Sequence, residues 1–292
     1  MRSATPLLSL LMLGGCAPDE TELAEVSELR VLGVVADPPE AAPGAPIQLS
    51  LVAASPSGPV IDGSVRWSVC SLPKALSEPG FASAACIDGA DPALPARSLS
   101  VSLSIPPEAC ARFGGADDAD LRPRDADDTG GYYQPVRAAL AGAANPTLVR
   151  LRMLCPLRDA PIDLVKAYAE RYRPNQNPAF DEVAAPEETG DRIVAPGAEI
   201  SLAVRVSANA FERFVTYEHS SNQLVERTES LTVSWFVSAG ELVENQVLVP
   251  EHGAVVTHFR APKKGGVVHV WVMLRDDRGG LNYRMQRLQI GG

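Results

Sequence analysis

The chain has 292 residues, of which 46% are hydrophobic and 21% are charged, and its formal net charge is −10. An acidic surface repels nucleic acid and anionic lipid headgroups, so both classes of partner are disfavoured. Beyond the N-terminal segment, no apolar run approaches the roughly 20 residues of a membrane-spanning helix, and we expect a globular body.

The first segment, residues 1–15, has the features of a secretory signal peptide. Arg2 precedes an apolar run at 7–13, and two glycines stand before Cys16. A basic start, a short apolar core and small residues before the cut suit export and cleavage. The motif resembles the lipobox of bacterial lipoproteins, which implies that Cys16 becomes the acylated, palmitate-bearing first residue. An ordinary signal peptide with a chance cysteine is the alternative.

The acylated cysteine predicts where the protein is held. Each buried acyl CH₂ contributes about 0.8 kcal/mol, so two or more chains anchor a protein stably to a membrane. Ala17 stands where an aspartate would resemble the inner-membrane retention signal of Gram-negative bacteria, which favours the outer membrane. Residues 16–28 are acidic and lack a strand pattern, which indicates a tether. We therefore predict a lipid-anchored protein of the bacterial cell envelope.

From Leu29 onward, short β-rich runs alternate with proline and glycine. Apolar residues occupy every second position in two of these runs, at Ile47, Leu49 and Leu51, and at Leu99, Val101, Leu103 and Ile105. Such alternation is typical of antiparallel strands with one face in a core. We predict a first β-sandwich over residues 29–158.

Four cysteines remain after Cys16, and all of them lie in this first half: Cys70, Cys86, Cys110 and Cys155. An even number in an exported chain indicates disulfides. Three connectivities are possible. We favour Cys70 with Cys86 and Cys110 with Cys155, because the first pair closes a short local loop. No Cys-x-x-Cys spacing supports zinc or thioredoxin-like chemistry.

An acidic loop at 116–131 contains closely spaced aspartates, among them Asp125, Asp127 and Asp128. Calcium binds six to eight oxygens, and such a loop with a glycine turn supplies several of them. The loop lacks the regular third ligand and the distant glutamate of an EF-hand. We favour a solvated acidic loop, with calcium as the alternative, and predict no cofactor.

Residues 159–174 contain the one convincing helical pattern. Five apolar or aromatic positions between Ile162 and Tyr172 fall on one face, Asp159 is a candidate cap, and Pro174 stops the segment. We predict a short helical linker that packs between or beside two domains. A membrane-binding helix is the alternative, disfavoured because its polar face carries mixed charge.

The second half repeats the order of the first. The Pro-Gly turn at 42–45 recurs at 195–198, and the tryptophan strand at 65–69 recurs at 233–237. A Pro-Gly turn delivers the chain into a strand, and a tryptophan on a central strand fills the space between two sheets. We predict two related sandwiches in tandem, the second spanning 175–292 with an insertion at 207–230.

The second unit also resembles a known family. Trp235, the Ala-Pro pair within 259–262, Gly265-Gly266 and the turn at 276–280 follow the order seen in bacterial immunoglobulin-like or polycystic-kidney-disease-like sandwiches. The resemblance implies an all-β fold of two tandem immunoglobulin-like antiparallel β-sandwiches. The second unit has no cysteines, unlike immunoglobulin domains that link two strands beside the tryptophan.

Chemistry-bearing motifs are few. The histidines, His219, His252, His258 and His269, all lie in the second half without a third zinc ligand, and we interpret them as ordinary hydrogen-bonded or exposed residues. The chain has no Gly-x-Ser-x-Gly nucleophile elbow and no His-Glu-x-x-His metalloprotease motif. It also lacks a phosphate-binding loop that ends in Gly-Lys-Ser/Thr and the dinucleotide-binding fingerprint. We predict a non-enzymatic envelope protein that binds a protein or glycan, or acts as a spacer. The alternatives are an envelope polysaccharide hydrolase with acids from 116–131 or 207–230, and a calcium-stabilised adhesion module.

Overall fold

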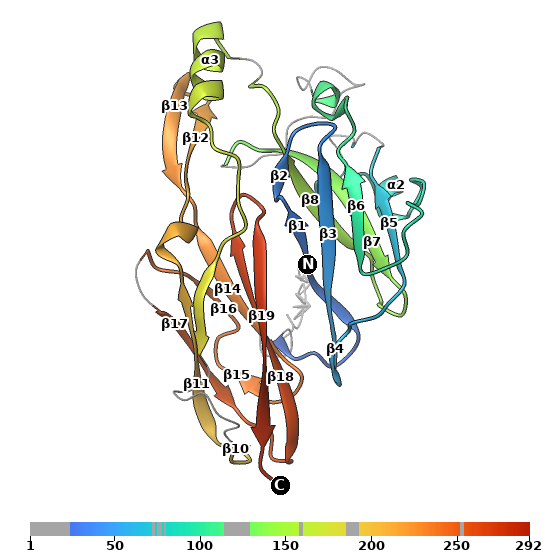
Figure 1. The fold of residues 1–292 in the computed structure, drawn as a ribbon, viewed down its shortest axis with the longest axis vertical. Helices are drawn as coiled ribbons and strands as arrows, with labels where there is room; N and C mark the ends of the chain where they lie inside the picture. The colour runs from blue at the N-terminus through green and yellow to red at the C-terminus, as the bar shows by residue number, and fades with distance from the viewer. Residues whose placement is uncertain are drawn as a thin grey trace, which may run out of the picture.

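The computed structural model describes residues 24–71, 74, 78, 80–113, 129–157, 160–184, 193–251 and 254–292. The signal peptide, Cys16, the calcium candidates Asp125, Asp127 and Asp128, the cap Asp159 and His252 lie outside the described residues. Within those ranges the fold is almost entirely β, with two sandwiches lying side by side (Figure 1). No helix of the described part has the length and apolar character needed to cross a membrane.

The first sandwich is built from two four-stranded sheets. One contains β1 (Arg30–Asp37), β3 (Pro46–Ser55), β4 (Gly58–Pro59) and β6 (Ser100–Ser104). The other contains β2 (Glu40–Ala41), β5 (Val65–Val69), β7 (Tyr132–Leu140) and β8 (Thr147–Met153). The alternating residues of β3 and β6 fill the space between the sheets, as the sequence predicts: Ile47, Leu49, Leu51, Val101 and Leu103 are buried.

The second sandwich pairs a five-stranded sheet with a four-stranded one. The first contains β10 (Ile193–Val194), β14 (Leu231–Val237), β16 (Gln246–Leu248), β18 (Gly266–Asp276) and β19 (Leu281–Ile290). The second contains β9 (Phe180–Ala184), β11 (Glu199–Val206), β15 (Glu241–Leu242) and β17 (Ala254–Arg260). β18 and β19 form the predicted closing hairpin.

The two sandwiches share one topology. In each, a two-residue strand pairs parallel with the last long strand, β2 with β8 and β10 with β19. The next strand inward is antiparallel, and beyond it lies the tryptophan strand, β5 or β14. Trp67 and Trp235 are both buried in their cores. The prediction of an all-β, immunoglobulin-like fold is therefore confirmed. The two tryptophan strands, β5 and β14, occupy equivalent places in their sandwiches.

The insertion of the second sandwich is a separate hairpin of β12 (Arg213–Glu218) and β13 (Gln223–Thr228), preceded by a 3-10 turn at Ala208–Ala210. The predicted helix forms as α3 (Ile162–Arg171), one residue shorter than expected at its end. It packs against both strands of this hairpin, and its inward-facing side chains are half-buried rather than fully buried. Pro161 begins the helix without a side-chain cap. The helix therefore lies on an outgrowth of the second sandwich.

The tether differs from the expectation for residues 16–28. Ala24 is buried in the second core, and Val26 is fully buried between the sandwiches. The Val26 amide donates to the Val237 carbonyl at 2.8 Å. The acidic composition of this segment concealed an alternation in which Ala24 and Val26 point inward and Glu25 and Ser27 point outward. The folded body therefore begins by Ala24.

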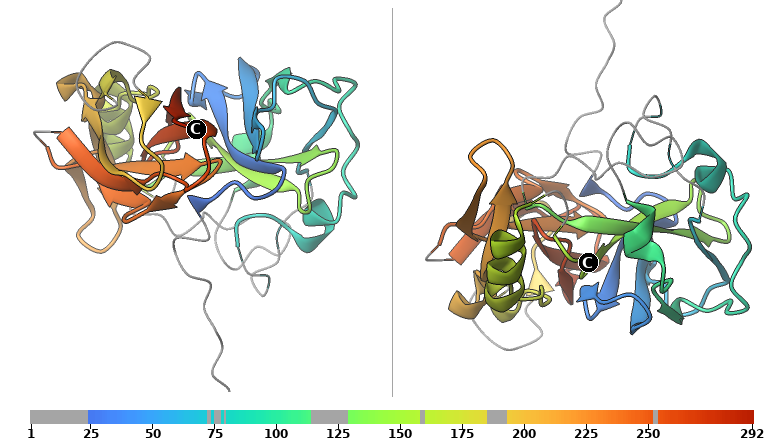
Figure 2. Two further views of the ribbon diagram at one scale, coloured as in Figure 1. Left: turned by 90° about the horizontal axis from the view of Figure 1, so that it is seen from below. Right: turned by 90° about the horizontal axis from the view of Figure 1, so that it is seen from above.

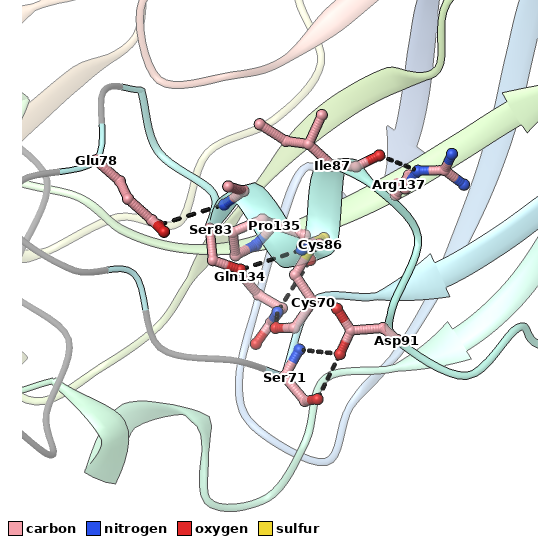
Figure 3. The surroundings of a disulfide bond; sticks show 11 residues. Cys70, Ser71, Glu78, Ser83, Cys86, Ile87, Asp91, Gln134, Pro135 and Arg137 are labelled. Carbon is pink, nitrogen blue, oxygen red and sulfur yellow. Dashed lines mark hydrogen bonds between the residues drawn. A yellow bond between two sulfur atoms is a disulfide. The ribbon is translucent and has the colours of Figure 1, made fainter.

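Two disulfides staple the first sandwich. Cys70 pairs with Cys86 and Cys110 with Cys155, each with a Cα–Cα distance of 5.5 Å, which is the connectivity that the sequence favours. Cys86 lies on the short helix α2 (Ala84–Ile87), and Cys110 lies on a 3-10 turn at Ala109–Arg112. Figure 3 shows the first disulfide, which ties the end of the tryptophan strand to α2. A long connection with little regular structure is thereby fixed to the core.

Candidate functional site

The two sandwiches meet along an apolar contact that we call the junction. Leu32, Val52 and Ala54 of the first sandwich form one buried cluster with three residues of the second. The second sandwich contributes Trp271, Met273 and Leu281, from β18 and β19. Both views of Figure 2 show β1 and β3 beside this hairpin. The outer face of a sandwich sheet is usually exposed to solvent. Here the outer faces of two sheets pack together and form an additional hydrophobic core.

Two glycines permit the close approach at the junction. A Cβ atom on Gly33 would lie 2.7 Å from Cδ2 of Leu281. Gly58 has a φ of +127°, and a Cβ atom there would lie 2.7 Å from Cε1 of His269. Non-glycine residues rarely adopt such a backbone conformation, so both steric space and backbone geometry favour glycine at this position.

One end of the junction is polar, and Glu40 lies at its centre. Its Oε1 is 3.2 Å from Nε of Arg152, and its Oε2 is 3.1 Å from Nη2 of Arg278. It also accepts hydrogen bonds from the Tyr172 hydroxyl at 2.7 Å and the Asn175 amide at 2.7 Å. We call Glu40, Arg152, Tyr172, Asn175 and Arg278 the Glu40 network. It joins the first sandwich, the connecting segment and the second sandwich.

Both arginines of the network are almost completely buried, with 1% and 0% of their side chains exposed. Arg152 further donates to the Thr129 hydroxyl at 2.6 Å and to the Tyr133 hydroxyl at 2.9 Å. Burial lowers the pKa of Arg152, but Tyr172, Tyr133 and Glu40 raise it above its ordinary value. Buried charges cost stability unless they are paired and hydrogen-bonded, and this pairing is dense.

A second set of acids surrounds Arg278 from the other side. Its Nη1 is 3.3 Å from Oε1 of Glu229, outside hydrogen-bond geometry, and its guanidinium lies 4.7 Å from the ring centre of Phe214. Burial and the neighbouring Asp276 together raise the pKa of Glu229 to about 8, and Arg278 lowers it in part. Burial likewise raises the pKa of Asp276. Glu229 therefore titrates near neutral pH inside the junction.

A groove of about 350 Å³ opens between the end of the first sandwich and α3. Glu40, Arg152 and Tyr172 line its polar part. Its apolar walls include Met153, Leu157, Val165, Tyr168, Ala169 and Pro174. The rings of Tyr168 and Tyr172 stack with centres 4.8 Å apart, and burial raises the pKa of Tyr168, so this phenol stays neutral. Apolar walls with a few fixed polar groups are typical of a binding groove.

The groove does not present a hydrolase site among the described residues. Glu40 is the one carboxylate among its described lining residues, and two arginines already engage it. Glycoside hydrolysis needs two carboxyl groups about 5–9.5 Å apart beside the substrate. Of the acids in the 207–230 insertion, Glu229 is enclosed in the junction with 1% of its side chain exposed.

The cysteines and histidines give no described metal centre. Sγ of Cys70, Sγ of Cys86 and a carboxylate oxygen of Asp91 lie within 4.8 Å of one another, but both sulfurs are in the disulfide. Asp91 instead accepts hydrogen bonds from the backbone and side chain of Ser71 (Figure 3). His258 and His269 lie on strands of different sheets.

Comparison with known proteins finds resemblance only in structure. No protein-family model matches the chain, and no curated protein matches it. The D0-D1 domain of Intimin has 12% identity and a TM-score of 0.23, covering 89% of this chain and 98% of its own. The Yersinia pseudotuberculosis adhesin InvE has 11% identity and a TM-score of 0.25, covering 88% of this chain and 58% of its own. A chimeric titin Z1Z2 tandem has 11% identity and a TM-score of 0.27, covering 90% of this chain and 100% of its own. We take the function from this chain's own residues.

Proposed function

We propose that the chain is a non-enzymatic, lipid-anchored protein of the bacterial cell envelope whose two sandwiches act as one rigid body. In this proposal the body presents the groove beside α3 to a protein or glycan partner. The observation that carries it is the Glu40 network, in which one buried carboxylate is shared by an arginine of each sandwich.

Rigidity follows from the chemistry of the junction. Contacts between domains of one chain are usually polar and permit relative motion. Here hinge motion would expose Trp271 and separate Arg278 from Glu40, which would then keep only Arg152 as an ionic partner among the described residues. The groove is lined by residues of the first sandwich and of α3, which packs against the β12–β13 hairpin of the second, so the fixed junction also preorganises the groove and reduces the entropic cost of binding.

The lipid anchor and the groove have different places in this proposal. Cys16 holds the chain to the outer membrane, and residues 17–23 connect it to the folded body. Strand β18 runs 11 residues from Gly266 to Asp276, beside the Glu40 network. At about 3.3 Å per residue it spans roughly 35 Å. The second sandwich therefore serves as a spacer along its own long strands.

Binding at the groove is tested with matched substitutions on one helix. Ala169→Arg places a long charged side chain in the groove, whereas Glu170→Arg changes an exposed position of the same helix outside the groove lining. We expect immobilised envelope glycans or purified envelope proteins to bind the native chain and the Glu170 variant, and to lose at least about tenfold in affinity for the Ala169 variant, a change of 1.4 kcal/mol. Equal binding by all three forms would refute the groove as the binding site.

The anchor and the absence of catalysis have separate tests. Mass spectrometry of the protein from bacterial membranes is expected to find acyl chains on Cys16, and Cys16→Ala is expected to release the protein from the membrane. An unmodified, freely secreted N-terminus would overturn the anchor. Incubation with cell-wall and capsular polysaccharides is expected to release no sugars, and any turnover would overturn the non-enzymatic assignment.

A further inference from the structure

We infer that the end of the second sandwich carrying Lys263 and Lys264 rests against an anionic phospholipid surface, and so directs the groove away from the membrane. The inference rests on the proposed acylation of Cys16. It adds an orientation to that anchor and a second, protein-borne contact with the lipid.

The first argument is the distribution of lysine. The chain has only four lysines, Lys74, Lys166, Lys263 and Lys264, and two of them are adjacent in the loop between β17 and β18. Both side chains of this pair are exposed, and neither forms an ion pair with a described residue. The nearby Arg260, in contrast, is paired with Glu241 at 3.2 Å. The loop therefore offers two ammonium groups without an ion-pair partner among the described residues, although Glu25 and Glu241 line the same depression.

The second argument is the reach of the tether. Glu25, one residue into the described body, lines the same surface depression of about 660 Å³ as Lys263 and Lys264. From Cys16 to Ala24 the chain advances eight residues, which extend to at most about 28 Å. An acylated Cys16 therefore keeps this end of the body within a short distance of the headgroups, since the chain enters the fold beside the lysine loop.

The third argument is the apolar surface beside the lysines. Ile193 of β10 and Val267 of β18 both pair with Gln289 of β19, so all three side chains are on one face of the sheet at one end. Ile193 is 65% exposed and Val267 is 41% exposed. Lysines next to exposed aliphatic side chains are the combination that binds membrane interfaces.

Charge also fixes the direction. The net charge of −10 disfavours anionic lipid for the molecule as a whole, so the attraction is confined to the lysine loop, and repulsion of the acidic remainder produces a preferred orientation. In Figure 1 the C-terminus, which lies at this end, is at the bottom and α3 is at the top. A body standing on the lysine loop therefore places α3 and the groove at its far end.

Lysine footprinting tests the orientation with controls built into the chain. The lipidated protein is reconstituted on neutral phosphatidylcholine vesicles and on vesicles with anionic phosphatidylglycerol, and acetylation rates are measured for each lysine by mass spectrometry. We expect Lys263 and Lys264 to react at least about five-fold more slowly on the anionic vesicles, with the rate at Lys166 on α3 unchanged. The inference would be overturned if the change in rate between the two kinds of vesicle were the same for Lys166 as for Lys263 and Lys264. If the protein still floats with the vesicles in that case, the anchor remains intact.

A second measurement does not require the lipid. The unlipidated Cys16→Ser chain is titrated with the same anionic vesicles, alone and with Lys263→Gln and Lys264→Gln. Each substitution is expected to weaken binding about five-fold at low salt, whereas Lys166→Gln is expected to change nothing. Equal losses for all three lysines, or none, would overturn the contact. An unmodified Cys16 in native membranes would instead overturn the proposed anchor.

Discussion

The two sandwiches have one topology but reach stability in different ways. The first carries both disulfides and a long irregular connection between β5 and β6, whereas the second has no cysteine. The second has longer central strands, with seven residues in β14 against five in β5, and 11 in β18 against nine in β7. It also buries two tryptophans, one in its core and one in the junction. The first sandwich thus combines shorter central strands with cross-links, whereas the second has longer central strands and no cross-link.

Removing the tryptophan from each core is the strongest test of this comparison. Trp67→Ala and Trp235→Ala each delete a fully buried ring, and we expect each to lower the free energy of unfolding by about 3–5 kcal/mol. Urea denaturation measures both variants with disulfides intact and reduced. When Arg278→Ala separates the two transitions, reduction should lower only the transition of the first sandwich, which Trp67→Ala also lowers. An equal effect of reduction on both would contradict the division between the sandwiches.

The Glu40 network decides whether the sandwiches unfold separately at all. Arg278→Ala removes the cation that lies beside the buried side chains of Glu40 and Glu229. We expect the free energy of unfolding to fall by about 3–5 kcal/mol. Arg171→Ala is the control, because it removes an exposed ion pair to Glu226 at 2.7 Å and should cost less than about 1 kcal/mol. In calorimetry the native chain should melt in one transition and the Arg278 variant in two. A single unshifted transition in the variant would refute the coupling of the two sandwiches by the Glu40 network.

The two disulfides are expected to differ from each other as well. Cys110 and Cys155 are 45 residues apart and Cys70 and Cys86 are 16 apart. In the chain-entropy account, the bond that closes the longer loop stabilises more. Removing Cys110–Cys155 by paired serine substitutions is therefore expected to cost about 1 kcal/mol more than removing Cys70–Cys86, within a typical range of about 2–4 kcal/mol. Chemical denaturation of the two double variants measures the difference. When Arg278→Ala is added to separate the two transitions, that of the second sandwich is expected to stay unchanged.

The junction is also expected to respond to pH. The pKa of Glu229 is about 8 when folded, against an ordinary value of 4.5. Between these values the unfolded chain has released its proton and the folded chain retains it, so stability falls as pH rises. For one proton the slope is at most about 1.4 kcal/mol per pH unit.

Glu229→Gln isolates this contribution. The variant cannot lose a proton from this position, so its unfolding free energy should depend less on pH between about 5 and 8 than that of the native chain. Asp276, whose pKa burial also raises, preserves part of the dependence. Denaturation at a series of pH values provides the comparison. An unchanged dependence in the variant would show that Glu229 is already ionised in the folded chain over this range.

The sequence predicts the two sandwiches because their signals are local. Alternation in β3 and β6, the Pro-Gly turns and the two tryptophan strands all follow from the period of a strand and the chemistry of a turn. The favoured cysteine connectivity also follows from proximity in the chain. These features do not depend on how one sandwich sits against the other.

The junction was missed because its signals are not local. Arg152 stands in a strand between apolar residues and Arg278 in a glycine-rich turn, and both patterns are typical of exposed arginines. One signal was present: the run from Val270 to Leu274 is continuously apolar, which indicates a strand buried on both faces. The partner face on β1 and β3 could be identified only from the three-dimensional arrangement.

The shared carboxylate of Glu40 also constrains how such a protein evolves. Immunoglobulin-like modules are commonly shuffled, because each unit folds alone and meets its neighbour through a replaceable linker. Here an exchange of either half by recombination would separate Glu40 from Arg278 and strand a charge in a dry interior. We therefore expect the two halves to be inherited together, and variation between relatives to concentrate in the exposed walls of the groove.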